Sequence, residues 1–255
     1  MRRLDTRGTR ALALKFAGDP RTARAHFAIE IGGASAWRTN DSRCYAVASE
    51  EGTGEVHLIG NGEAGEIMEF LRPLPQDARI NMSRHMFAQI SGMVTPRSVR
   101  TIEIYTGPAG MTPIRVPPPR TDFDVRAVLY SDLPALSSLP YDAGFLFEGY
   151  KDPRNILAHS TAYGAFNGTR LASLAIAELG RTFASIWTYT LHDLRGKGLA
   201  THCVASIMDN LRLTGERPLF TIRAENGSPE RAMARRFGWE MAGELAMVER
   251  CHIAL

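Results

Sequence analysis

The sequence is poor in cysteine and lysine and contains no long hydrophobic run. Its three cysteines, Cys44, Cys203 and Cys251, form no CxxC pair, which argues against a disulfide framework or a zinc site and favours a reducing cytosol. No apolar run approaches the roughly 18 residues of a transmembrane helix. Lysine is nearly absent, so arginine carries most of the positive charge. These absences favour a soluble, cytoplasmic protein without a metal centre.

What remains is the composition of a globular protein. The 255 residues are 44% hydrophobic and 22% charged, which suits two domains of ordinary size. A net charge of +3, from 30 basic and 27 acidic residues, indicates no nucleic-acid or membrane partner. Residues 1–24 are more basic, but Lys15 interrupts the apolar stretch that a secretory signal would need. We therefore expect a partly ordered basic N-terminus.

The clearest boundary is a run of three prolines at residues 117–119. Proline cannot donate a backbone hydrogen bond and restricts the residue before it, so consecutive prolines indicate an extended linker. We predict a linker at 117–121 between a smaller α+β domain at 1–116 and a second domain at 122–255. Before the linker, the patterns predict strands at 43–48, 56–59 and 100–105, a helix at 63–71, and mixed helix and loop at 77–93.

The second half has sharper signals. The dipeptide Asn167-Gly168 predicts a tight hairpin between strands at 163–166 and 171–178. Apolar residues at helical spacing predict an amphipathic helix at 199–213 that ends at Gly215. Further strands are predicted at 123–128, 182–190, 218–222 and 239–248, with helices starting near 131–134 and at 228–229. These elements predict an α+β fold with a mixed, mostly antiparallel sheet flanked by helices, completed by the last strand.

One segment carries a chemical signal. Arg195-Gly196-Lys197-Gly198-Leu199-Ala200 lies between a predicted strand and the start of the amphipathic helix. Glycines let the backbone turn tightly there, and the free N–H groups of a helix start attract an anion. The spacing does not match a Walker A loop, because Lys197 precedes Gly198. A phosphate or pyrophosphate is the expected occupant, and a turn without a ligand is the alternative.

This segment resembles the acyl-CoA signature of the GNAT N-acetyltransferase superfamily, Gln/Arg-x-x-Gly-x-Gly/Ala, with Arg195, Gly198 and Ala200 at the specified positions. Residues 224–228 and 232–239 are similar to the family's ending of strand, asparagine, helix, glycine and aromatic residue. The resemblance covers about 122–255 and implies a GNAT-like acetyltransferase domain there that uses acetyl-CoA. It leaves 1–116 as a degenerate copy of the fold or another α+β domain.

The resemblance also implies a set of cofactor-binding residues. Backbone N–H groups of the turn and helix start would hold the CoA pyrophosphate, and the preceding strand would run beside the pantetheine. The peptide groups near Thr190 would polarise the thioester carbonyl, and Asn226 would contact the pantetheine arm or the thiol. The implied residues are Thr188, Tyr189, Thr190, Arg195, Gly196, Lys197, Gly198, Leu199, Ala200, Thr201 and Asn226.

Catalytic side chains are harder to place. Many GNAT proteins have a tyrosine four residues before the closing glycine, but that position here is Ala234, so the thiol would leave with other assistance. Glu148 is the candidate general base, because an acid between aromatic residues can have a raised pKa. An exposed loop carboxylate is the alternative for Glu148. Glu178, His159 and His192 are further candidates.

A second glycine motif occurs in the first half. Residues 60–65, Gly-Asn-Gly-Glu-Ala-Gly, match the GxGxxG pattern of dinucleotide-binding proteins. Glu63 and Glu66 would place carboxylates beside a pyrophosphate. We therefore favour a simple turn and helix start over nicotinamide or flavin binding.

Together these observations predict an acetyl-CoA-dependent N-acetyltransferase that works by direct attack of an amine on the thioester. Its partner would be a small-molecule or peptide amine whose identity the sequence does not specify, and a homodimer is compatible with the sequence. A non-catalytic CoA-binding sensor or interaction module is the alternative, which the missing tyrosine would permit. We expect residues 1–116 to shape the acceptor pocket and to bind no second CoA.

Overall fold

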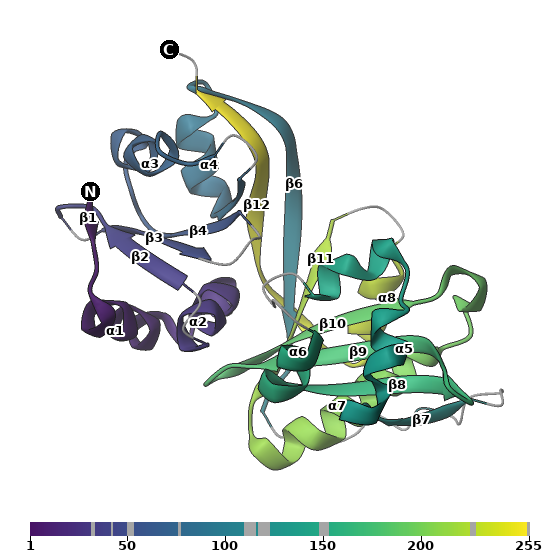
Figure 1. Cartoon of the computed structure of the whole chain (residues 1–255). Coiled ribbons are helices and arrows are strands. Elements are labelled where there is room, and N and C mark those ends of the chain that lie inside the picture. Colours follow the sequence, from purple (N-terminus) through teal and green to yellow (C-terminus); the bar gives the residue numbers. More distant parts are fainter. Residues whose placement is uncertain are drawn as a thin grey trace. The chain divides into compact units, whose positions relative to one another are not determined.

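The computed structural model describes residues 1–31, 34–41, 43–49, 54–75, 78–109, 116, 123–147, 153–224 and 228–253. The chain forms two compact units (Figure 1). Unit 1 comprises Met1–Ile104, Ile222–Ser228 and Met241–Leu255, and unit 2 comprises Tyr105–Thr221 and Pro229–Glu240. No helix in these described ranges is long and apolar enough to cross a membrane.

Unit 1 is built around a sheet with the strand order β1-β2-β3-β4-β5-β12-β6. Its β4 and β5 run parallel, whereas β2, β3 and β4 pair antiparallel. The elements are β1 (Arg2–Arg3), α1 (Thr6–Phe16), the 3-10 helix η1 (Pro20–Thr22), α2 (Ala23–Glu30), β2 (Ala34–Arg38), β3 (Cys44–Ser49), β4 (Glu55–Gly60), α3 (Ala64–Leu71), β5 (Arg79–Met82), α4 (Arg84–Ile90), β6 (Val94–Thr106) and β12 (Glu240–Ile253).

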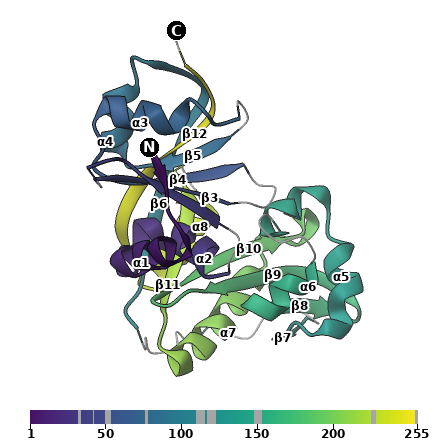
Figure 2. The same cartoon turned by 60° about the vertical axis from the view of Figure 1, so that its left-hand side comes forward.

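Helices cover both faces of this sheet, as Figure 2 shows. Successive residues of β3 alternate between the two faces, because the side chains of a strand point to opposite sides. Cys44 and Ala46 pack with α3 and α4 in one apolar cluster, whereas Tyr45 and Val47 pack with α1 and α2 in another. The alternation of β3 therefore decides which helices each side chain meets.

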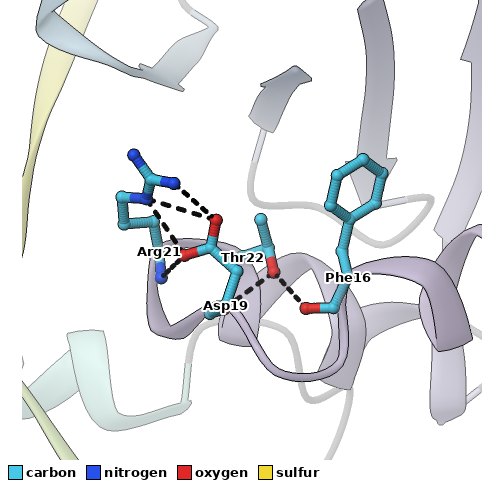
Figure 3. Close-up of polar contacts among 4 residues, drawn as sticks. All are labelled: Phe16, Asp19, Arg21 and Thr22. Carbon is cyan, nitrogen blue, oxygen red and sulfur yellow. Dashed lines mark hydrogen bonds and ion pairs between the residues drawn. The ribbon is translucent and has the colours of Figure 1, made fainter.

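The N-terminal segment is more ordered than expected. Asp5 caps α1 by accepting a hydrogen bond from the N–H of Gly8. After α1, the carboxylate of Asp19 accepts bonds from the backbone and the guanidinium of Arg21, and Thr22 donates its hydroxyl to the carbonyl of Phe16 at 2.9 Å (Figure 3). Burial opposes ionisation of Asp19, but Arg21 outweighs it and lowers the pKa of Asp19. The prediction of a partly ordered N-terminus is wrong, because these caps and the apolar face of α1 fix it.

Unit 2 has the strand order β11-β10-β9-β8-β7. The predicted hairpin is confirmed: β8 and β9 pair antiparallel, ending at Asn167↔Arg170, and Gly168 has a φ of 58°. The elements are β7 (Asp124–Ala127), η2 (Tyr130–Asp132), α5 (Leu133–Ser137), η3 (Tyr141–Phe147), α6 (Pro153–His159), β8 (Ser160–Asn167), β9 (Arg170–Leu179), β10 (Phe183–Thr190), η4 (His192–Leu194), α7 (Leu199–Thr214), β11 (Arg217–Arg223) and α8 (Pro229–Arg236).

The sheet of unit 2 is likewise covered on both faces. The long helix α7 follows one face, and α5 and α6 cover the other (Figure 1). On the α5–α6 face, Trp187 and Tyr189 of β10 join an apolar cluster with Leu174 and Ile176 of β9. Because side chains alternate along a strand, Thr188 and Thr190 point to the α7 face. The predicted α+β fold with a mixed, mostly antiparallel sheet is confirmed.

The two halves of the described chain repeat one order of elements. Without the 3-10 helices, both read β-α-α-β-β-β-α-β-α-β, from β1 to β6 and from β7 to β12. The last strand of the second half lies mostly in unit 1: β12 pairs antiparallel with β5, through Ala246↔Met82. In unit 2, Gly107, just after β6, donates its N–H to the Pro218 carbonyl of β11 at 3.3 Å.

The place of β12 differs from the organisation expected from the sequence. The strand predicted at 239–248 was expected to complete the second domain, and that expectation is wrong, because most of β12 lies in unit 1. The units also divide at Ile104 and Tyr105, before the predicted linker. Residues 117–121 lie outside the described residues, so the linker stays a prediction.

Candidate cofactor site

Strand β10 has one open edge. It runs parallel to β11 and is paired with it from Phe183↔Arg217 to Ile186↔Phe220. Beyond Ile186, β10 continues its pairing with β9 on the other side, as far as Thr190↔Ser173. Among the described residues, the backbone of β10 after Ile186 therefore has no strand partner on the side of β11.

The peptide groups of Thr188 and Thr190 face this edge. The carbonyl of Thr182 accepts a hydrogen bond from the β11 side at 2.9 Å, and the N–H of Leu191 donates one to β9 at 3.0 Å. Because successive residues of a strand direct their peptide groups to opposite sides, even-numbered residues here face β11 and odd-numbered ones face β9. Of the three residues expected beside the pantetheine, Tyr189 thus turns its peptide groups toward β9.

Two glycines shape the turn that follows. Gly196 and Gly198 have φ angles of 76° and 77°, which other L-residues adopt only with strain. Apart from the glycine itself and its two chain neighbours, no described atom lies within 4 Å of the position a Cβ would take on either glycine. Arg195 donates its Nε–H to the carbonyl of Thr190 at 3.2 Å, which ties the turn back to β10. Lys197 is exposed, so the turn borders open space and has cationic side chains.

Helix α7 begins at this turn without a side-chain cap. Gly198 is its N-cap, and an intrahelical bond runs from the N–H of His202 to the Gly198 carbonyl at 3.2 Å. The N–H groups of Leu199, Ala200 and Thr201 therefore have no acceptor within the helix. These groups and the positive end of the helix dipole favour a bound anion.

The corresponding turn of unit 1, between β4 and α3, is closed. A Cβ on Gly60 would overlap a backbone carbonyl, and one on Gly62 would lie 2.8 Å from the Cβ of Cys44. Glu63 and Glu66 form a capping box at the start of α3, in which Glu66 accepts a bond from the N–H of Glu63 at 3.0 Å. Carboxylates and packed protein atoms therefore fill this turn. The predicted turn and helix start at the GxGxxG motif is confirmed.

A buried carboxylate lies near the point where the edge opens. Glu178 is on the α5–α6 face of β9 and is only 6% exposed. It accepts a hydrogen bond from the indole Nε1–H of Trp187 at 3.0 Å, and Trp187 is the first residue of β10 after its last pair with β11. Glu178 therefore contacts the side chain of the first residue of the open segment of β10.

The structure describes only some of the other predicted residues. Glu148 and Asn226 are outside the described residues. His159 is the exposed last residue of α6, and His192 is the exposed first residue of η4. Ala234 is completely buried on α8, so the chain provides no hydroxyl at the position of the family's tyrosine.

The remaining ionisable groups near α7 contribute positive charge to the site but no reactive nucleophile. Burial, followed by the charge of Arg236, lowers the pKa of His202, which places a cation near the first turn of α7. Burial raises the pKa of Cys203 to about 12, so this thiol stays protonated and belongs to the core. In the part of the chain that the structure describes, no group of three or more His, Cys, Asp or Glu side chains is placed to hold a metal ion.

Solved structures resemble the chain over nearly its whole length. A GCN5-related N-acetyltransferase-like protein from Streptococcus suis 89/1591 matches with a TM-score of 0.68 and 13% identity, over 96% of this chain and 99% of its own. A GCN5-related N-acetyltransferase from Kribbella flavida matches with a TM-score of 0.60 and 12% identity, over 90% and 93% of the two chains. The chain has the GCN5-related N-acetyltransferase fold. No family sequence model and no curated protein sequence matches it.

The GNAT fold accounts for more of the chain than the sequence motif does. A putative acetyltransferase of the GNAT family from Novosphingobium aromaticivorans also matches, with a TM-score of 0.57 and 16% identity, over 82% of this chain and 89% of its own. The motif at 195–200 indicated this fold for 122–255 alone. These matches cover nearly the whole chain, and the element order is repeated in its two halves.

Proposed function

We propose that this protein is an N-acetyltransferase that binds acetyl-CoA at unit 2 and transfers the acetyl group to an amine. The proposal rests mainly on the open edge of β10. A turn that borders open space connects this edge to the start of α7, which has no side-chain cap. Such an edge offers peptide groups to an amide-containing arm, and such a helix start suits a pyrophosphate. The pantetheine arm and the pyrophosphate of CoA therefore both find complementary groups.

The charges around the turn support the same ligand. Arg195 and Lys197 are exposed beside the free N–H groups of α7. In unit 1 the corresponding turn carries Glu63 and Glu66 in a capping box. An anionic cofactor would therefore be attracted to unit 2 and repelled from unit 1, which supports one cofactor per chain.

The chain's own residues would assist the transfer in defined ways. When bound, acetyl-CoA supplies an activated thioester. The peptide groups of Thr188 and Thr190 would orient the cofactor along the edge, and Glu178 would accept the proton that the amine loses as the amide bond forms. Ala234 cannot donate a proton, so the leaving thiolate, with an ordinary thiol pKa of about 8.5, would take its proton from water, and Glu178 would release the amine's proton to water.

Gly198→Asp tests the cofactor assignment. The new carboxylate would cap α7 itself and repel the pyrophosphate, so acetyl-CoA affinity should fall at least about a hundredfold. Gly168→Asp is the matched control, because Gly168 also has a positive φ and open space around it but lies in the β8–β9 hairpin. Isothermal titration calorimetry with acetyl-CoA measures both. Equal affinity of folded Gly198→Asp and wild-type protein would refute the site.

A second measurement separates the enzyme from a CoA-binding sensor. Thiol release from acetyl-CoA is followed in the presence of amino acids, polyamines, aminoglycosides and peptides with free N-termini. Amine-dependent release supports the transferase. Tight acetyl-CoA binding without thiol release for any amine of the panel supports the sensor. The buried Ala234 is the observation that favours this alternative.

A further inference from the structure

We propose that Asp142 is a positioning residue of the cofactor site, holding the open edge of β10 and the start of the glycine turn in the conformation that receives CoA. The inference rests on the proposed function, because it assigns Asp142 a role in acetyl-CoA binding. Asp142 lies on η3, far from the glycine turn in the sequence, and no motif points to it.

The carboxylate of Asp142 joins two parts of the site. Its Oδ1 accepts a hydrogen bond from the hydroxyl of Tyr189 at 2.8 Å, and its Oδ2 lies 2.9 Å from Nε2 of His192. Tyr189 is the second-last residue of β10, and His192 is the first residue of η4. One side chain therefore connects the end of the open strand with the beginning of the turn.

This part of β10 needs such support because it has lost β11. On the β9 side, Ser173 donates its hydroxyl to the carbonyl of Tyr189 at 3.0 Å. On the α5–α6 face, the buried ring of Tyr189 packs with Phe145, with 6.4 Å between ring centroids. Asp142 holds the hydroxyl at the outer end of the same ring. Apolar packing thus fixes the ring, and Asp142 fixes its polar end.

Both partners have the charge state that this hydrogen bond requires. Burial raises the pKa of Tyr189, and the neighbouring Asp142 raises it further, so the phenol stays protonated and donates. The hydrogen bond from Tyr189 lowers the pKa of Asp142 in spite of desolvation, and His192 adds to the effect. The carboxylate therefore stays ionised and accepts bonds at neutral pH.

Preorganisation explains why the support matters for binding. The turn contains Gly196 and Gly198 in left-handed conformations, and glycine loses more conformational freedom on ordering than any other residue. A turn held in place before binding avoids part of that loss. Asp142 holds the segment at its first residue, His192, and Arg195 holds it to Thr190 farther along.

The sign of the effect distinguishes positioning from simple electrostatics. A carboxylate near an anion site repels the anion, so charge alone predicts that removing it would tighten acetyl-CoA binding. The positioning role predicts weaker binding. Asp193 is the matched control: it lies next to His192, is exposed, and pairs with Arg170 at 3.1 Å without contacting β10 through any bond described.

The experiment titrates acetyl-CoA into full-length wild type, Asp142→Ala, Asp142→Asn and Asp193→Ala by calorimetry. We expect the Kd of acetyl-CoA to be about tenfold higher for Asp142→Ala than for the wild type. Asp193→Ala should bind equally or more tightly. Asp142→Asn keeps an oxygen for Tyr189 and should restore most of the affinity. Equal or tighter binding by Asp142→Ala overturns the proposal, as does a lower melting temperature with an unchanged Kd.

Tyr189→Phe keeps the test decisive if Asp142→Ala does not fold. It removes the hydroxyl and keeps the buried ring, and we expect it to weaken acetyl-CoA binding severalfold. Combined with Asp142→Ala, it should add little further loss, because both changes remove the same bond. Unchanged affinity of Tyr189→Phe counts against the proposal. Absence of saturable acetyl-CoA binding by the wild type instead refutes the proposed function.

Discussion

Trp187 donates its indole N–H to the buried carboxylate of Glu178, with 3.0 Å between the two atoms. We expect Glu178→Gln to lower kcat for amine acetylation by about 10²–10⁴-fold, because the amide can still accept the indole bond but cannot take a proton. The acetyl-CoA Kd should stay unchanged. Steady-state thiol release with an amine from the acceptor screen measures kcat, with the exposed Asp209→Asn as control. An unchanged kcat would assign the proton to another group.

One acetyl-CoA should bind per chain. The Glu63 and Glu66 capping box and the packing around Gly62 close the unit 1 turn. Replacing both glutamates by alanine should cost about 1–2 kcal/mol of stability through loss of the cap. The calorimetric stoichiometry should nevertheless remain one, because Cys44 still fills the space beside Gly62. A second equivalent site in wild type or variant would contradict the closed turn.

Unit 1 should lose stability in acid through a buried polar cluster. Glu55 accepts bonds from Asn81 at 2.7 Å and Arg24 at 3.1 Å. Burial opposes its ionisation, but Arg24 and its other neighbours lower the pKa of Glu55 below its ordinary 4.5. Burial lowers the pKa of His57 below its ordinary 6.5, against the attraction of Glu55. In each case the unfolded chain binds the proton first, so stability falls as pH drops below 6.5 and again below 4.5.

Urea denaturation across this pH range tests the acid sensitivity. His57→Gln should flatten the dependence just below pH 6.5, the ordinary pKa of histidine, because it removes the proton-binding group. His85→Gln, at an exposed position of α4, should leave it unchanged. A wild-type midpoint that does not fall between neutral pH and about pH 5 would show that His57 contributes nothing.

The two halves should not fold separately. A chain starting at residue 123 lacks Thr106 and Gly107, which bond to Pro218 of β11, and lacks β5, the partner of β12. We expect such a fragment to show no cooperative thermal transition by circular dichroism. Mixing it with residues 1–116 should restore the transition and acetyl-CoA binding. A cooperative transition for residues 123–255 alone would show that the contacts of Thr106, Gly107 and β5 are dispensable.

Local signals in the sequence located much of the structure. Gly215 ends α7 with a φ of 88°, and Gly168 occupies the hairpin with a φ of 58°, as their positions predict. The turn at Gly196 and Gly198 was found in the same way. These features depend on the backbone of one or two residues, so the residue type specifies them directly. For most of the strands and helices that were predicted, the ends differ by one or two residues, but β6 begins well before its predicted start and β12 ends well after its predicted end. The prediction of helix and loop at 77–93 missed β5, and no element was predicted for β1, α1, α2 or β2.

Long-range relationships had no comparable signal. Tyr189 and Asp142 form a hydrogen bond although they are 47 residues apart in the sequence. The local pattern of η3 does not distinguish Asp142 from an ordinary surface aspartate. The order of the N-terminus was missed because Asp5, Asp19 and Thr22 act through short-range bonds that the basic composition obscured. Composition describes a segment's average charge, whereas order depends on which individual groups find partners.

By itself, the sequence determined most strands and helices of the second half, the positions of the glycine turns, and the start of α7 that favours a bound anion. Only the tertiary structure decided that β12 pairs with β5, that Cys44 and two glutamates close the unit 1 turn, and that Asp142 supports the open edge. The physical reason is that backbone hydrogen bonds are the same for every residue except proline. The sequence pattern of a strand therefore predicts that the strand will pair in a sheet, but it does not predict which strand will be its neighbour.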